Sequence, residues 1–246
     1  MIYKKNDARI IVRGMKDGIP ICLGYFAVSF AFGMLAVTSG LSVLQAVGLS
    51  LTNLTSAGQV AGVSLIQAGA AYYEMALTQL IINLRYCLMS FSLSQKIDRK
   101  APFFHRFFIS YGITDEIFAV AASQKDKVGP GYIYGLISVA APGWVLGTLC
   151  GAVAGNLMPA SLVNALGIAI YGMFLAIIIP QAKSDKVILA CVAGAMVLSA
   201  LFEVLPGLKR VSAGFVIIIV TVVVAGTAAW LFPVKEPSGE DREHGT

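Results

Sequence analysis

Residues 42–70 have the sequence SVLQAVGLSLTNLTSAGQVAGVSLIQAGA, in which apolar ends flank the polar centre TNLTSAGQ at 52–59. As one helix this segment would extend about 43 Å at about 1.5 Å per residue, too short to cross a bilayer core about 30 Å thick twice. We therefore predict two half-helices that meet at TNLTSAG and return to the side they entered from. Broken helices at membrane depth line cavities or are buried in protein, and in transporters they form the binding site.

The rest of the 246-residue chain has the composition of a polytopic membrane protein. Hydrophobic residues make up 57% of it and charged residues 13%, whereas a soluble domain is about 25% charged. The predicted fold is all-α, with about six full transmembrane helices plus the re-entrant or broken pair. Apolar runs long enough to span a bilayer lie near residues 19–38, 74–96, 130–155, 161–180, 187–205 and 213–232.

We predict a single transmembrane domain over residues 1–232, followed by a short polar tail at 233–246. LQAVGL at 44–49 resembles VNALGI at 163–168. This similarity suggests an internal repeat with halves at 19–96 and 130–232.

The distribution of basic residues sets the expected topology. If 42–70 enters and returns, the amino terminus, the 97–128 connection and the tail all face the cytoplasm, and so does the 181–186 loop. All but three of the 18 lysines and arginines then lie inside, as the positive-inside rule requires. We expect an inner-membrane, multi-pass protein with both termini cytoplasmic, whose residues 4–16 form an amphipathic helix on the lipid surface. The basic residues lie in loops, without a stripe typical of nucleic-acid binding.

Arg85 stands at the centre of the apolar segment TQLIINLRYCLMSFSLS at 78–94. A charge there costs on the order of 2.5 to 3.5 kcal/mol on insertion scales, so it needs a partner. The candidate partners are Asp115, Glu116 and Glu203. Two interpretations remain open: a structural ion pair, or a direct hold on a substrate carboxylate.

Polar and small residues recur at helical spacing on two of the predicted spans. Gln79, Asn83, Tyr86 and Ser90 share one face, which predicts either interhelical hydrogen bonds or the lining of a pathway. Glycines at every fourth position of another span predict close approach of a second helix within the same bundle. These glycines are Gly143, Gly147, Gly151 and Gly155.

Nothing in the sequence predicts an enzyme. The chain has no GxxxxGK[ST] motif, and neither histidine has an acidic or cysteine neighbour at ligand spacing, so we expect no metal and no cofactor. An intramembrane enzyme would need a catalytic pair on adjacent faces, and the sequence shows none.

With these residues in view, the chain resembles the AzlC family, the large subunit of the AzlC and AzlD branched-chain amino acid exporters. The resemblance runs through AGQVAGVSLIQAGA, INLRYCLMSFSLSQKID, TDEIFAV and GWVLGTLCGAVAG. The family's motifs match Gln59, then Asn83, Arg85 and Tyr86, then Asp115, Glu116, Phe118 and Ala119. Two departures are SAGQVAG in place of GAAQF, and ALGIAIYGMFLA, which lacks the aspartate that many relatives carry.

The resemblance implies a secondary transporter, or permease, that exports branched-chain or related apolar amino acids by alternating access. It also implies a small AzlD-type membrane subunit as partner, within membrane lipid. The expected substrate-binding residues are Asn53, Gly58, Gln59, Asn83, Arg85 and Tyr86. Asp115, Glu116 and Glu203 are candidates for proton coupling or ion pairing. The alternative is a membrane channel, or a structural subunit of a membrane complex without carrier activity.

Overall fold

The computed structural model describes residues 2–97, 102–124, 126–158 and 182–233, with a few positions between 172 and 180. Over these residues the fold is helical, with no strand beyond one isolated bridge. The chain divides into two compact units, Met1–Phe174 and Leu175–Thr246. The predicted all-α membrane architecture is confirmed.

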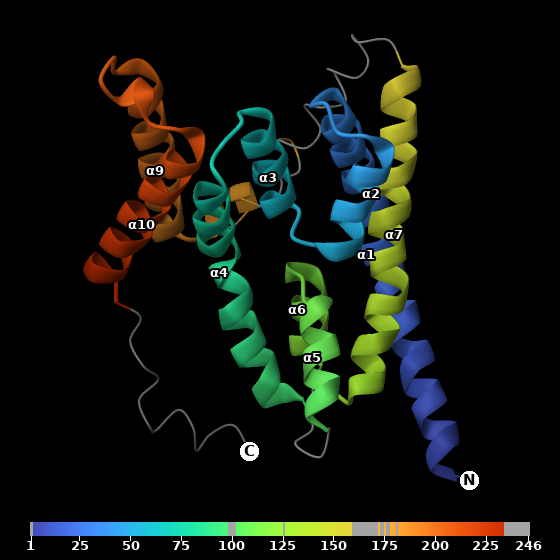
Figure 1. Ribbon diagram of the computed structural model, residues 1–246. Helices are drawn as coiled ribbons and strands as arrows, with labels where there is room; N and C mark the ends of the chain where they lie inside the picture. Colours follow the sequence, from blue (N-terminus) through green and yellow to red (C-terminus); the bar gives the residue numbers. More distant parts are fainter. Residues whose placement is uncertain are drawn as a thin grey trace. The chain divides into compact units, whose positions relative to one another are not determined.

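The first unit holds seven helices within its described residues (Figure 1). They are α1 (Ile2–Thr38), α2 (Val43–Thr52), α3 (Ala57–Gln67), α4 (Tyr72–Lys96), α5 (Phe103–Tyr111), α6 (Asp115–Ala122) and α7 (Pro130–Leu157). The second unit holds α9 (Lys186–Val204), the short 3₁₀ helix η1 (Leu208–Arg210) and α10 (Ala213–Leu231), with α9 packed against α10.

Five described helices are long and apolar enough to cross a membrane, and they correspond to five of the six predicted spans. Most of the sixth, 161–180, lies outside the described residues. So do VNALGI at 163–168 and nearly all of the tail at 233–246. The predicted internal repeat therefore stays a prediction.

Helices α1 and α7 run parallel and pack closely because glycines line their contact. Gly143 lies on Cys22, Gly147 on Phe26, Gly151 on Phe30 and Gly155 on Met34, so each step of four on one helix matches a step of four on the other. A side chain at Gly151 would collide with the carbonyl oxygen of Phe30. The predicted packing of this glycine face within the bundle is confirmed.

The separate surface helix expected at residues 4–16 is wrong. Helix α1 continues without interruption from Ile2 to Thr38. The reason lies in its small residues, because Gly14 faces Tyr132 and Gly18 faces Leu136 on α7. The amino-terminal part of α1 is therefore held on α7.

The broken helix predicted within 42–70 is confirmed. Ser42 begins α2 with a capping box, in which its hydroxyl accepts from the Gln45 amide while the Gln45 side chain accepts from the Ser42 amide. The helix ends at Thr52, and α3 begins at Ala57. Ser56 has a φ of 49°, in the left-handed region that favours glycine, so the chain turns sharply between the two helices. Both half-helices lie in the upper part of the first unit in Figure 1.

A second pair of half-helices, α5 and α6, lies where the sequence predicted a simple cytoplasmic connection at 97–128. Ile97 and Val128 form a bridge, so this segment leaves and returns at one place. In Figure 1, α5 and α6 lie in the lower part of the first unit. The Tyr111 hydroxyl, at the end of α5, donates to the carbonyl oxygen of Leu51 near the end of α2. Two half-helix pairs therefore meet from opposite ends, and Ile109 of α5 with Ile117 and Ala121 of α6 packs in the core.

Candidate functional site

A cavity of about 320 Å³ lies at the break between α2 and α3. Four amide side chains and two glycines supply its polar and open wall, and the other wall is apolar. The amides and glycines are Asn53, Gln59, Gln79, Asn83, Gly58 and Gly62, and the apolar side chains are Leu49, Val63, Ile66 and Met75. This volume is typical of small-molecule sites. Of the described residues that line it, none is acidic or basic.

One hydrogen-bond chain leads to this cavity from α7. Thr148 donates to the carbonyl oxygen of Trp144 at 3.0 Å, and its hydroxyl oxygen lies 2.7 Å from that of Ser50. Gln59 Nε2 donates to Ser50 Oγ at 3.1 Å. The polar side chains of Thr148, Ser50 and Gln59 are fully or almost fully buried. This hydrogen-bond chain therefore ties α7, α2 and α3 together at the break.

A second hydrogen-bond chain reaches the cavity from α3 through α4. Gln79 Nε2 donates to the carbonyl oxygen of Gly58 at 2.8 Å, and Asn83 Nδ2 donates to Gln79 Oε1 at 3.0 Å. Gln79 and Asn83 are one helical turn apart, which places both side chains on the same face of α4. Of the polar face predicted on this helix, Gln79 and Asn83 therefore contact the broken pair, whereas Tyr86 and Ser90 line another cavity.

Gly58 leaves room for these side chains. A Cβ at this position would crowd the Thr55 hydroxyl and would lie 2.9 Å from Gln79 Oε1 and 3.1 Å from Asn83 Oδ1. Its own amide donates to the Thr55 carbonyl at 3.3 Å. Gly58 thus contributes a carbonyl acceptor and open space.

Arg85 lies on the opposite side of α4 from this cluster and forms an ion pair with α6. Its Nη1 lies 2.6 Å from Asp115 Oδ2, and its Nη2 donates to the Tyr86 hydroxyl at 3.3 Å. The side chains of Arg85 and Asp115 are each 43% exposed. Asp115, one of the predicted partners, pairs with the guanidinium.

Glu116 contacts α1 instead. The Tyr25 hydroxyl donates to Glu116 Oε2 at 2.6 Å and also hydrogen-bonds the Thr114 hydroxyl. Thr114 caps the amino terminus of α6 by accepting from the amide of Ile117. Asp115 and Glu116 lie in the first turn of α6, so their negative charges also interact favourably with the positive end of the helix dipole.

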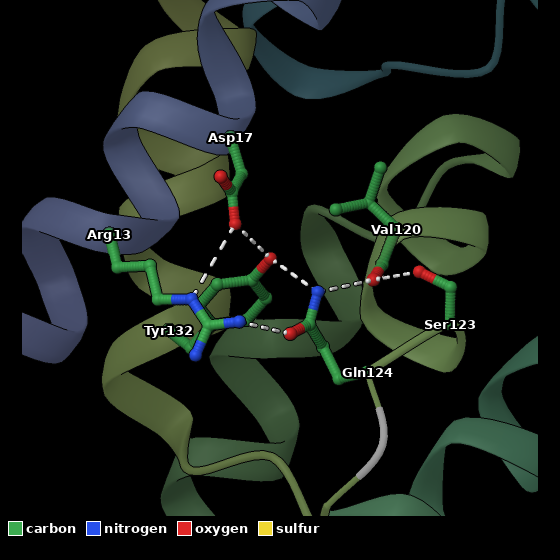
Figure 2. Close-up of polar contacts among 6 residues, drawn as sticks. All are labelled: Arg13, Asp17, Val120, Ser123, Gln124 and Tyr132. Carbon is green, nitrogen blue, oxygen red and sulfur yellow. Dashed lines mark hydrogen bonds and ion pairs between the residues drawn. The ribbon is translucent and has the colours of Figure 1, made fainter.

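A further polar cluster joins α1, α7 and the residues after α6 (Figure 2). Arg13 Nη2 donates to Gln124 Oε1 at 2.8 Å, and Gln124 Nε2 donates to the Tyr132 hydroxyl at 2.9 Å. Tyr132 donates to Asp17 Oδ2 at 2.7 Å, and that carboxylate lies 4.0 Å from Arg13 Nε. We name these four residues the Arg13 ring. Its hydrogen bonds start at the Arg13 guanidinium, which can only donate, and end at the Asp17 carboxylate, which can only accept and which lies beside Arg13.

The structure separates the predicted substrate-binding residues into two groups. Asn53, Gly58, Gln59 and Asn83 line the cavity at the break. Arg85 and Tyr86 lie toward α6, and Tyr86 lines a different, mostly apolar cavity between α4 and α5.

Asn53 and Glu203 are two of the predicted site residues. The Asn53 side-chain oxygen already accepts from the amide of Thr55 at 3.0 Å. Glu203 lies on α9, in the second unit.

Sequence reasoning missed Ser50 and Thr148, and it named Gln79 only as part of a polar row. A hydroxyl residue in an apolar helix carries little signal, since it often bonds only to its own backbone. The apolar sequence FFISYGITDEIFAVAA held a stronger signal for α6, because TDE is a capping pattern.

These features define a helical membrane protein with a broken-helix cavity of the kind found in transporters. The family model described as AzlC protein matches residues 20–158. The chain belongs to the AzlC family. The family and its membrane-protein relatives support a role in membrane transport.

Two relatives match over most of the chain. The inner membrane protein YgaZ of Escherichia coli is 28% identical over 203 residues, which are 78% of this chain and 82% of that protein. An uncharacterized membrane protein of Archaeoglobus fulgidus is 30% identical over 200 residues, 80% of this chain and 88% of the relative. No solved structure matches the chain.

Proposed function

We propose that this protein is a secondary transporter that exports branched-chain or related apolar amino acids across the cytoplasmic membrane. The observation that carries the proposal is the cavity at the break, which combines an apolar wall with amide side chains. An amino acid needs both an apolar pocket for its side chain and polar groups for its charged ends. The proposed mechanism is alternating access around the meeting point of the two half-helix pairs.

Orientation and partner are part of the same proposal. Arg13 on α1 and Lys127, just before α7, line one pocket, so basic residues gather at one end of the first unit. By the positive-inside rule we assign this end to the cytoplasm. We also propose a small AzlD-type membrane subunit as partner, as the resemblance to the family implies.

The Arg85–Asp115 pair is our candidate for coupling transport to protons. Protonation of Asp115 would remove the charge that compensates Arg85 between α4 and α6. Arg85→Lys keeps the charge but loses the planar fork that reaches both Asp115 and Tyr86. We expect this variant to fold and to export at a sharply reduced rate. Unchanged export would leave Arg85 as a packing residue.

A counterflow assay on purified protein in liposomes tests the proposed function. Liposomes loaded with unlabelled leucine should accumulate labelled leucine transiently, and the initial rate should saturate with concentration. Flux that does not saturate would indicate a channel, and no leucine flux with or without a small partner subunit would overturn the assigned substrate class.

A further inference from the structure

The direction of the hydrogen bonds at Gln59 fixes which end of its amide is left without a partner. The Trp144 carbonyl can only accept, so Thr148 uses its one hydroxyl proton there. Ser50 must then donate to Thr148 across 2.7 Å, which leaves the Ser50 oxygen to accept from Gln59 Nε2. With the amide reversed and Thr148 still donating to the Trp144 carbonyl, the Ser50–Thr148 contact would have no proton. Gln59 Oε1 therefore points away from Ser50.

The second hydrogen-bond chain, from Gly58 through Gln79 to Asn83, has a fixed direction for the same reason. The Gly58 carbonyl accepts, so the nitrogen of the Gln79 amide must face it. Gln79 Oε1 is then turned toward Asn83, whose nitrogen donates to it. Asn83 Oδ1 is left at the end of the chain.

Each of the two hydrogen-bond chains ends at a buried oxygen that accepts no hydrogen bond. Gln59 is 2% exposed, and neither its Oε1 nor Asn83 Oδ1 accepts a hydrogen bond from any described residue. The Thr55 hydroxyl, also crowded against Gly58, has no partner either. Leaving one buried acceptor unsatisfied costs about 1 to 3 kcal/mol. A site that holds several such oxygens is built for a group that brings donors or positive charge.

We propose that this cavity binds a positively charged group, either the primary ammonium of an amino acid or an alkali cation, through Gln59 Oε1 and Asn83 Oδ1. An ammonium carries three N–H donors, and carbonyl-type oxygens also replace the hydration shell of alkali cations. Divalent cations prefer carboxylates, which the lining does not supply. The inference deepens the proposed function and rests on it for the choice of amine.

The test uses two halves of leucine with nearly the same apolar tail. The compound 3-methylbutylamine keeps the ammonium and lacks the carboxylate, and 4-methylpentanoate does the reverse. Each is added to the detergent-purified full-length protein, and the melting temperature is measured, since a bound ligand stabilises the folded state. Sodium chloride is compared with choline chloride at equal ionic strength.

We expect the amine to raise the melting temperature and the acid to leave it unchanged. If sodium also raises it relative to choline and competes with the amine, the cation site is shared with an alkali ion. Stabilisation by the amine alone assigns the site to the substrate ammonium. Stabilisation by the acid alone, or by neither the amine nor sodium, would overturn the inference.

Two variants locate the effect at the cavity. Asn83→Leu removes the acceptor at similar volume and should abolish the shift. Asn83→Asp turns it into a charged acceptor and should tighten amine binding by about tenfold at pH 8. Gln67→Glu, at the exposed end of α3, introduces the same kind of charge outside the cavity and should change nothing. If Asn83→Leu fails to fold, the Asn83→Asp result decides, and no gain in affinity there counts against the site.

Failure of this inference is distinguishable from failure of the proposed function. Saturable leucine exchange that is inhibited by 4-methylpentanoate but not by the amine would keep the transporter and overturn the cation site. Amine or sodium binding that depends on Asn83, in a protein without leucine exchange, would keep the cation site and overturn the amino acid substrate.

Discussion

The Arg13 ring and the cavity at the α2–α3 break are both polar clusters among apolar helices, but they differ in how their hydrogen bonds end. In the Arg13 ring three hydrogen bonds follow one another from Arg13 to Asp17, and the Asp17 carboxylate lies 4.0 Å from Arg13 Nε, so the series returns to its start (Figure 2). At the break, two chains begin at backbone carbonyls and end at the orphan oxygens of Gln59 and Asn83. A closed cluster holds helices together, whereas an open one has unused capacity for a ligand.

The largest effect should come from breaking the ion pair between Arg85 and Asp115. Asp115→Asn leaves Arg85 without its carboxylate in the middle of α4. We expect the free energy of unfolding to fall by about 3 kcal/mol, the order of the cost of an unpaired charge in a span. Denaturant titration in detergent micelles measures it.

The double variant Arg85→Gln with Asp115→Asn is the control for that prediction. It removes both charges at once, so we expect most of the lost stability to return. An Asp115→Asn protein as stable as the unaltered one would show that solvent or lipid headgroups compensate Arg85 instead.

The second-largest effect should come from filling space in the cavity at the α2–α3 break. Gly58→Ala places a methyl group against the Thr55 hydroxyl and close to Gln79 Oε1. These are side-chain atoms that can move, so we expect the protein to fold while the acceptors shift out of place. The initial rate of leucine counterflow should fall by about tenfold, which corresponds to about 1.4 kcal/mol.

Gly62→Ala is the matched control, because it lies one turn along α3 and lines the same cavity. There a Cβ would meet Gln79 Nε2 at 3.3 Å and little else. Equal losses in the two variants would mean that cavity volume, and not the placement of oxygens, limits transport.

The sequence was sufficient to predict the break but not the second half-helix pair. The polar residues between Thr52 and Gln59 interrupt an apolar segment, and such an interruption has few structural solutions in a bilayer. Residues 97–128 carry basic residues at both ends, which favoured a cytoplasmic connection. Their apolar interior instead forms α5 and α6, because the bridge at Ile97 and Val128 lets the chain enter and return.

The candidate site was predicted in part for a similar reason. Asn83 and Gln59 stand out as amides in apolar helices. Whether an amide ends as a donor or an acceptor depends on partners distant in sequence, such as Thr148, which is 98 positions from Ser50. Only the packing of α7 against α2 supplies that direction.

A smaller effect should follow from removing one member of the hydrogen-bond chain that orients the Gln59 side chain. Ser50→Ala removes the oxygen to which Gln59 Nε2 donates. We expect the Michaelis constant for leucine exchange to rise by about fivefold, corresponding to about 1 kcal/mol for one hydrogen bond. Ser64→Ala, an exposed serine on α3 that bonds only its own helix backbone, should leave it unchanged. An unaltered Michaelis constant in Ser50→Ala would show that Gln59 is held by other contacts.

The smallest effect should come from the Arg13 ring, and it should be confined to stability. Tyr132→Phe removes the hydroxyl that accepts from Gln124 and donates to Asp17, so two bonds of the ring are lost together. Arg13 is 68% exposed, and water therefore replaces part of what is lost. We expect the free energy of unfolding to fall by about 0.5 to 1.5 kcal/mol, with the Michaelis constant unchanged. A raised Michaelis constant would contradict the distinction between the two clusters, because it would mean that a closed network at one end of α1 and α7 also sets the geometry of the cavity at the break.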